Sequence, residues 1–154
     1  LAQVDRFNPG SNAIVSRVDS EALLRQAQER DAQLARGESM GWMHGMPQAI
    51  KDLANVQGLR TSLGSPLMKD VVAAEDGLMA QRMKASGAIV IGKTNTPEFG
   101  LGSHTFNEVF GPTRNAWDPS KSAGGSSGGA AVALAPGLPG RFGRWTPPAG
   151  AGGS

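Results

Sequence analysis

A continuous apolar run, Ala88-Ile89-Val90-Ile91, restricts the fold of this chain more than any other stretch. An unbroken run of this kind is typical of a parallel strand that is covered on both faces. A shorter apolar run precedes it at residues 48–53, and a stretch with helical spacing, from Asp76 to Gly87, lies between the two. We expect strand, crossover helix and strand to form a β-α-β unit, so the predicted fold class is α/β.

The flanking segments carry local signals of their own. Phe7-Asn8-Pro9 predicts a turn, and residues 12–15 predict a short strand. Asp19 or Ser20 should cap an amphipathic helix that runs to about Arg36 and stops at Gly37. We expect Asp76 to cap the next helix, and residues 55–75 to be mostly loop.

The composition excludes several classes of protein. A chain of 154 residues that is 39% hydrophobic can bury one modest core. The net charge is +2 and no dense Lys/Arg run occurs, so nucleic-acid binding is not predicted. The chain has no cysteine, hence no disulfide and no thiolate metal site, which is compatible with the cytoplasm. No signal-peptide pattern opens the chain and no apolar run has the length of a membrane span, so no membrane partner is expected.

The most unusual local feature is the loop Gly124-Gly125-Ser126-Ser127-Gly128-Gly129, which runs directly into small apolar residues at 130–135. Such a loop can close its N–H groups on an anion or present a hydroxyl, and a helix behind it would aim its positive end at the serines. A flexible linker and a phosphate-binding loop are alternatives, although the latter needs a Lys after its last glycine. A nucleophile elbow fails, because a loop precedes the serines and no histidine follows His104.

Lys51 interrupts the short apolar run at residues 48–53. Burial of an ammonium group is costly unless the group is paired or neutral. Lys51 therefore either points outward from an edge strand or is a desolvated amine whose lowered pKa lets it act as a base.

Other polar residues are weaker candidates. Lys93, Asn95 and Glu98 follow the apolar strand at its carboxyl end, where α/β folds bind ligands, but turn roles explain them equally well. His44 and His104 are isolated from each other and from any acidic cluster, so we expect no metal site and no cofactor.

Taken together, the ordered motifs resemble the amidase signature family. They are Gly45-Met46-Pro47 with Ile50-Lys51-Asp52-Leu53, Gly87 to Asn95, Glu98-Phe99, Asn107, Phe110 to Asp118, and Ser122 to Gly129. The resemblance runs from about residue 10 to Leu138. It implies an α/β/α fold with a mixed central sheet, of which residues 1–138 would form the truncated N-terminal part.

The resemblance also implies a Ser–cisSer–Lys hydrolase that cleaves a carboxamide C–N bond and releases ammonia or an amine. Lys51 looks like the catalytic lysine and Ser126 like the bridging serine on a cis peptide, while Gly124, Gly125 and Ser127 would contact substrate. Neutral Lys51 would take a proton through Ser126 from a nucleophilic serine, which forms an acyl-enzyme. The expected partner is a small-molecule amide. A homodimeric full-length enzyme, or the glutaminase subunit of a tRNA-dependent amidotransferase with partner chains, remain alternatives.

The tail, residues 139–154, departs from the family pattern. The resemblance places the nucleophile roughly two dozen residues after Ser126, near Gly150, in a loop that forms the oxyanion hole. The tail is instead dense in Gly and Pro, and Ser154 comes too late. A reading-frame shift after about Leu138, or a truncation with a foreign tail, would explain the difference. We therefore expect no amidase turnover from the chain as written; a non-catalytic fragment and a nucleotide-binding module are the competing hypotheses.

Overall fold

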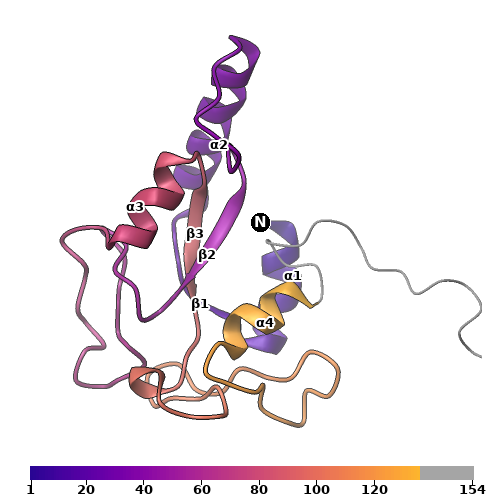
Figure 1. Ribbon diagram of the computed structural model, residues 1–154. Helices are drawn as coiled ribbons and strands as arrows, with labels where there is room; N and C mark the ends of the chain where they lie inside the picture. The colour runs from indigo at the N-terminus through magenta and orange to yellow at the C-terminus, as the bar shows by residue number, and fades with distance from the viewer. Residues whose placement is uncertain (136–154) are drawn as a thin grey trace, which may run out of the picture.

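The computed structural model describes residues 1–135 of the chain (Figure 1). The predictions for the tail at residues 139–154, including Ser154 and the position near Gly150, lie outside the described residues. In chain order the elements are helix α1 (Ala2–Ser11), strand β1 (Ile14–Arg17), helix α2 (Ser20–Ala35), strand β2 (Pro47–Lys51), helix α3 (Leu78–Ala85), strand β3 (Ile89–Thr94), the 3-10 helix η1 (Glu98–Gly100) and helix α4 (Gly128–Leu134).

The described strands form one small mixed sheet in the order β1-β3-β2. β3 lies in the centre, parallel to β2 and antiparallel to β1, and all six of its residues are buried. β2, α3 and β3 form the predicted β-α-β unit, which confirms the α/β class and the mixed sheet. The parallel pairing brings the carboxyl ends of β2 and β3 to the same edge of the sheet.

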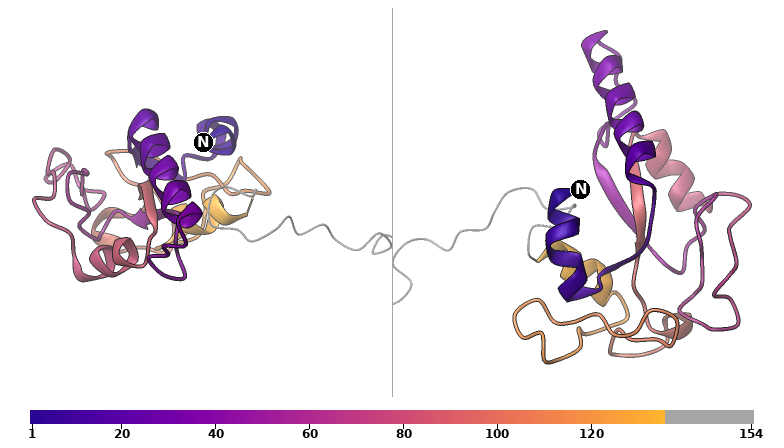
Figure 2. Two further views of the ribbon diagram at one scale, coloured as in Figure 1. Left: turned by 90° about the horizontal axis from the view of Figure 1, so that it is seen from above. Right: turned by 180° about the vertical axis from the view of Figure 1, so that it is seen from behind.

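Apolar side chains pack on both faces of the sheet, because successive residues of β3 point to opposite sides. One cluster joins Ile89 and Ile91 to residues of α1, α2 and α4: Val4, Leu23, Val132 and Ala133. The other joins Val90 to Ile50, Val56 and Ala80 of α3. Figure 2 shows α1 and α4 side by side, away from α3. The continuous apolar run therefore predicted the central strand correctly.

The predicted start and stop of α2 are confirmed. Asp19 is the N-cap, and its Oδ2 accepts a 2.9 Å hydrogen bond from the Ala22 N–H. Gly37, just past the helix, has a φ of 77°, which favours glycine. No helix or strand interrupts residues 55–75, so the predicted loop is confirmed as well.

Two local predictions are wrong. Phe7-Asn8-Pro9 is not a turn but lies within α1, which continues until Asn12 takes the left-handed conformation. Asn8 ties this end of the helix to β1, since its Oδ1 accepts from the Ile14 N–H at 2.8 Å. Asp76 does not cap α3, whose N-cap is Gly77. The Asp76 carboxylate instead accepts from the Gln57 N–H and from Lys84 Nζ, both at 2.7 Å.

Candidate active site

Lys51 is the last residue of β2 and stands at the edge of the sheet where β2 and β3 both end. Its backbone pairs with Thr94, the last residue of β3. The side chain is partly buried, and this loss of solvation lowers the pKa of the Lys51 ammonium below its ordinary value. This shift has the direction that the desolvated-amine alternative requires, and the side chain is only partly buried.

The glycine-rich loop brings two hydroxyl groups to this lysine. Lys51 Nζ lies 2.9 Å from Ser126 Oγ and 3.0 Å from Ser127 Oγ. The peptide bond between Gly125 and Ser126 is cis. The structure thus joins the two separate features that the sequence singled out, the lysine in the apolar run and the serines in the loop.

Helix α4 holds the C-terminal side of this loop against the sheet. Ser127 is the N-cap residue of α4, which begins at Gly128 as the small apolar run predicted. A Cβ at Gly129 would lie 2.6 Å from Asn95 O and 2.8 Å from Ala13 O, so only glycine permits this approach. The N–H groups that open the helix therefore lie next to the two serines.

The polar residues at the carboxyl end of β3 and just after it have structural surroundings. Lys93 is fully buried, and its Nζ donates to Asp52 Oδ1 at 3.2 Å and to Thr61 Oγ1 at 3.0 Å. Desolvation lowers the pKa of Lys93, although Asp52 acts in the opposite direction. Asn95 is also fully buried and donates to Thr113 Oγ1 at 3.0 Å. Their side chains thus hold loops in place, whereas Glu98 is exposed on η1.

The two histidines lie in separate places. A ring nitrogen of His44 lies 2.9 Å from Arg30 O, and one of His104 lies 3.3 Å from Ser122 Oγ. Within residues 1–135 no group of three or more His, Cys, Asp or Glu side chains could hold a metal ion. In the same range, no helix is long and apolar enough to cross a membrane.

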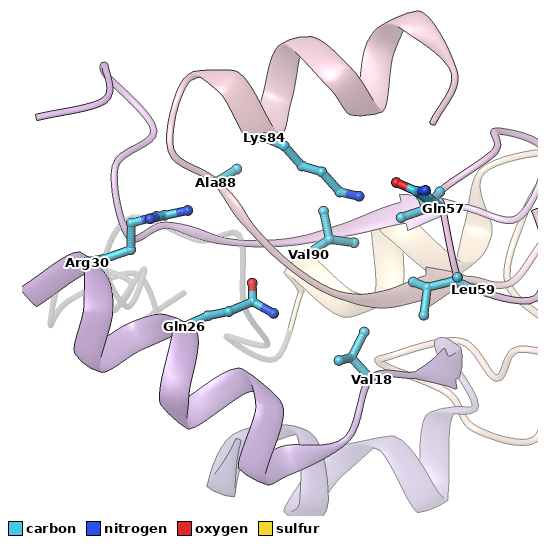
Figure 3. A pocket seen from close by; sticks show the side chains of 10 residues that line it. Val18, Gln26, Arg30, Gln57, Leu59, Lys84, Ala88 and Val90 are labelled. Atoms are coloured by element: carbon cyan, nitrogen blue, oxygen red, sulfur yellow. The ribbon is translucent and has the colours of Figure 1, made fainter. Parts of the chain in front are cut away.

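Two cavities differ in their relation to the lysine and the serines. A cavity of about 330 Å³ is lined by Gly124, Gly125 and Ser127, the residues predicted to contact substrate, together with apolar side chains of Trp117 and Val132. A second cavity, of about 320 Å³, lies between α2 and α3, where Gln26, Arg30, Lys84 and Val90 line it (Figure 3). No residue that the sequence proposed for the site borders the second cavity.

Comparison with known proteins agrees with the geometry. The family model described as Amidase matches residues 1–139. An acylamidase of Rhodococcus erythropolis is 45% identical over 138 residues, which are 90% of this chain and 29% of that protein. One of the subunits of the glutamyl-tRNA(Gln) amidotransferase of Acidothermus cellulolyticus is 43% identical over 135 residues, 88% of this chain and 26% of that protein.

Solved structures agree as well. The structure of 6-aminohexanoate cyclic dimer hydrolase in complex with substrate matches with a TM-score of 0.77 and 35% identity, over 90% of this chain and 27% of that one. The chain thus spans less than a third of the length of these relatives. With a family model that covers nearly all of its length, the chain belongs to the Amidase family.

Proposed function

We propose that this chain carries the proton-transfer part of an amide-hydrolysing site, with Lys51 as the base and Ser126 as the relay. The observation that carries the proposal is the 2.9 Å hydrogen bond between Lys51 Nζ and Ser126 Oγ. A lysine can accept a proton only in its neutral form, and the lowered pKa of Lys51 raises the share of that form. The nucleophilic serine would come from a segment outside residues 1–135.

The proposed reaction proceeds through an acyl-enzyme. The nucleophilic serine attacks the carbonyl carbon of the amide and gives its proton to Ser126 Oγ, while the Ser126 proton passes to Lys51 Nζ. The C–N bond then breaks, and the protonated site returns a proton to the leaving ammonia or amine. Water repeats the sequence on the ester and frees the acid. The loop's cavity, bordered by Gly124, Gly125 and Ser127, supports contact with a small amide.

The relatives leave two enzymatic alternatives for the whole protein. One is an amidase that acts alone or as a homodimer on a small amide, as the similarity to an acylamidase suggests. The other is a glutaminase subunit that works with partner chains, as the similarity to an amidotransferase subunit suggests. We favour the first, because the acylamidase shares the higher identity.

The test begins with the coding sequence from the codon of Ala130 to well past Ser154. If an adjacent frame continues with a Gly-Ser-x-Arg loop, the protein in that frame should release ammonia or amine from simple carboxamides. Lys51→Met and Ser126→Ala should each then lower kcat by about 100-fold to 10,000-fold, the range of general acid–base catalysis.

The matched control is Lys69→Met, which removes the same charge from an exposed loop position and should leave kcat unchanged. Full turnover in the Lys51→Met protein would refute the role of this lysine. If all frames close soon after Ser154, the non-catalytic alternative holds instead.

A further inference from the structure

Both ends of the serine loop meet one buried hydroxyl group, that of Thr105. This side chain is fully buried. Its Oγ1 donates to Gly124 O at 2.9 Å and accepts from the Gly128 N–H at 3.0 Å. A hydroxyl group has one proton to donate, and its oxygen can also accept. The Thr105 hydroxyl donates to the first end of the loop, at Gly124, and accepts from the other end, at Gly128. Ser126 and Ser127 lie between these two attachment points.

The backbone around Thr105 repeats the same connection. The Thr105 N–H donates to Ala123 O at 3.0 Å, and the Gly125 N–H donates to Ser103 O at 2.6 Å. Residues 103–105 thus run beside residues 123–125 and fix where the loop begins. On the far side of the serines, α4 packs against the sheet through Gly129, and the Thr105 hydroxyl adds a hydrogen bond at Gly128, the first residue of that helix.

The start of α4 shows what this arrangement does for Ser127. A serine at an N-cap ordinarily turns its hydroxyl onto the N–H groups of the first helical turn. Ser127 is the N-cap of α4 but makes no such bond, and its Oγ lies 3.0 Å from Lys51 Nζ instead. The helix receives a side-chain acceptor from Thr105, at Gly128, rather than from its own N-cap.

The contact between Thr105 and Gly128 leaves no room for adjustment. A Cβ at Gly128 would lie 2.7 Å from Thr105 Cβ and 3.0 Å from Ala123 Cβ. Real atoms do not approach so closely, so the first residue of α4 must be glycine for the hydroxyl to reach its N–H.

We propose that Thr105 is a positioning residue: its hydroxyl spans the serine loop and thereby holds Ser126 and Ser127 on Lys51. The inference rests on the proposed function of Lys51 and Ser126. Thr105 acts only through the loop, and its side chain is shielded from solvent. Without its hydroxyl, the Gly128 N–H and the Gly124 carbonyl would have to find new partners. With one attachment lost at each end, the loop would shift relative to Lys51 and carry Ser126 and Ser127 away from it.

The experiment compares three variants of the 154-residue chain with wild type by NMR. Thr105→Val removes the hydroxyl at nearly constant volume, and Thr105→Ser keeps it. Thr94→Val is the matched control, because Thr94 is also a buried threonine but its Oγ1 has no hydrogen-bond partner. Three quantities are measured: the nuclear Overhauser contact between Lys51 Hε and Ser126 Hβ, the pKa of Lys51 from its Cε resonance, and the exchange rate of the Gly128 amide.

In Thr105→Val we expect the Lys51–Ser126 contact to disappear and the Gly128 amide to exchange at least about tenfold faster. The pKa of Lys51 should rise toward its ordinary value, because displacement of the loop lets water reach the amine. Thr105→Ser and Thr94→Val should match wild type in all three quantities. A purely structural role for Thr105 would lower the unfolding temperature without moving the Lys51 pKa.

Two results would overturn the inference. If Thr105→Val keeps the wild-type contact and pKa, the hydroxyl does not position the serines. If Thr105→Ser behaves like Thr105→Val, the methyl group rather than the hydroxyl holds the loop. A separate failure is visible in wild type: with no Lys51–Ser126 contact and an ordinary pKa, the proposed function itself fails, and this inference with it.

Discussion

Lys93 Nζ and Asp52 Oδ1 form a 3.2 Å ion pair in which both side chains are shielded from solvent. Asp52 directly follows Lys51, so the pair fastens the residue next to the candidate base to the central strand. The same carboxylate accepts from the Ser62 hydroxyl at 2.5 Å and from the Ser62 N–H. One buried carboxylate thus joins the end of β2, the end of β3 and the loop at residues 61–64.

Removal of Asp52 should strongly destabilise the fold. Asp52→Ala leaves the Lys93 ammonium buried without its partner, and such a loss typically costs about 3–5 kcal/mol. We expect a loss of that size in the free energy of unfolding, measured with urea and circular dichroism. The double variant Asp52→Leu with Lys93→Met should recover much of it, because no buried charge remains.

The control for this prediction is Asp70→Ala, which removes an exposed carboxylate from a loop and should change stability by less than about 0.5 kcal/mol. The prediction is wrong if Asp52→Ala is as stable as this control.

The lowered pKa of Lys51 should make stability depend on pH. Between the folded-state pKa and the ordinary lysine value of 10.5, the unfolded chain binds a proton that the folded chain has released. The free energy of unfolding should therefore rise with pH across this window. Lys93 has a lowered pKa as well and contributes with the same sign, so wild type must be compared with Lys51→Met.

The difference between the two proteins isolates Lys51. We expect wild type to gain stability relative to Lys51→Met as the pH rises from neutral toward 10.5, measured by urea unfolding at each pH. Parallel curves for the two proteins would show that Lys51 titrates alike in both states.

Sequence patterns predicted the parts of the fold that depend on neighbouring residues. The apolar run at 88–91, the Asp19 cap and the stop at Gly37 each act within a few positions, and each appears where it was expected. The prediction for Asp76 was wrong because its local pattern suits a cap, whereas its carboxylate accepts hydrogen bonds from the Gln57 N–H and from Lys84 in the last turn of α3. The turn predicted at Phe7-Asn8-Pro9 was wrong because the burial of Val4 and the hydrogen bonds of the Asn8 side chain favour a helix over the local turn signal.

The candidate site was predicted only in its separate pieces. The lysine in an apolar run and the serines between glycines are unusual locally, but only the resemblance to a family joined them. Thr105 and the partner of Lys93 were not found, since neither has an unusual neighbourhood in the sequence. Thr105 contacts Gly128, 23 residues away, and Lys93 contacts its partner 41 residues away. The pattern of neighbouring residues in the sequence does not predict contacts over such distances.

The two ends of the glycine-rich loop should differ sharply in their tolerance of a methyl group. A Cβ at Gly129 would meet the backbone of Asn95 and Ala13, whereas one at Gly124 has its nearest neighbour, Ser103 O, at 4.0 Å. Gly129→Ala should lower the free energy of unfolding by about 1–3 kcal/mol, the cost of an overpacked contact. Gly124→Ala is the control and should stay within about 0.5 kcal/mol of wild type. Thermal unfolding of the two proteins tests this, and equal melting temperatures would contradict it.

The ion pair between Asp76 and Lys84 should stabilise the fold at neutral pH and fail in acid. Burial raises the pKa of Asp76, but hydrogen bonds from Lys84 and from the Gln57 N–H outweigh it, so the net pKa lies below the ordinary value of 3.8. A carboxylate with a lowered folded-state pKa stabilises the fold above its ordinary pKa, and this contribution is lost as the pH falls through the folded-state value.

Asp76→Asn should therefore lower the free energy of unfolding by about 1–2 kcal/mol at neutral pH and by progressively less below 3.8. Urea unfolding of both proteins from neutral pH into acid measures the difference, with Asp70→Asn as the exposed control. If the difference in the free energy of unfolding between wild type and Asp76→Asn stayed constant with pH, the charge of the carboxylate would contribute nothing to stability, and only the shape of the side chain would matter.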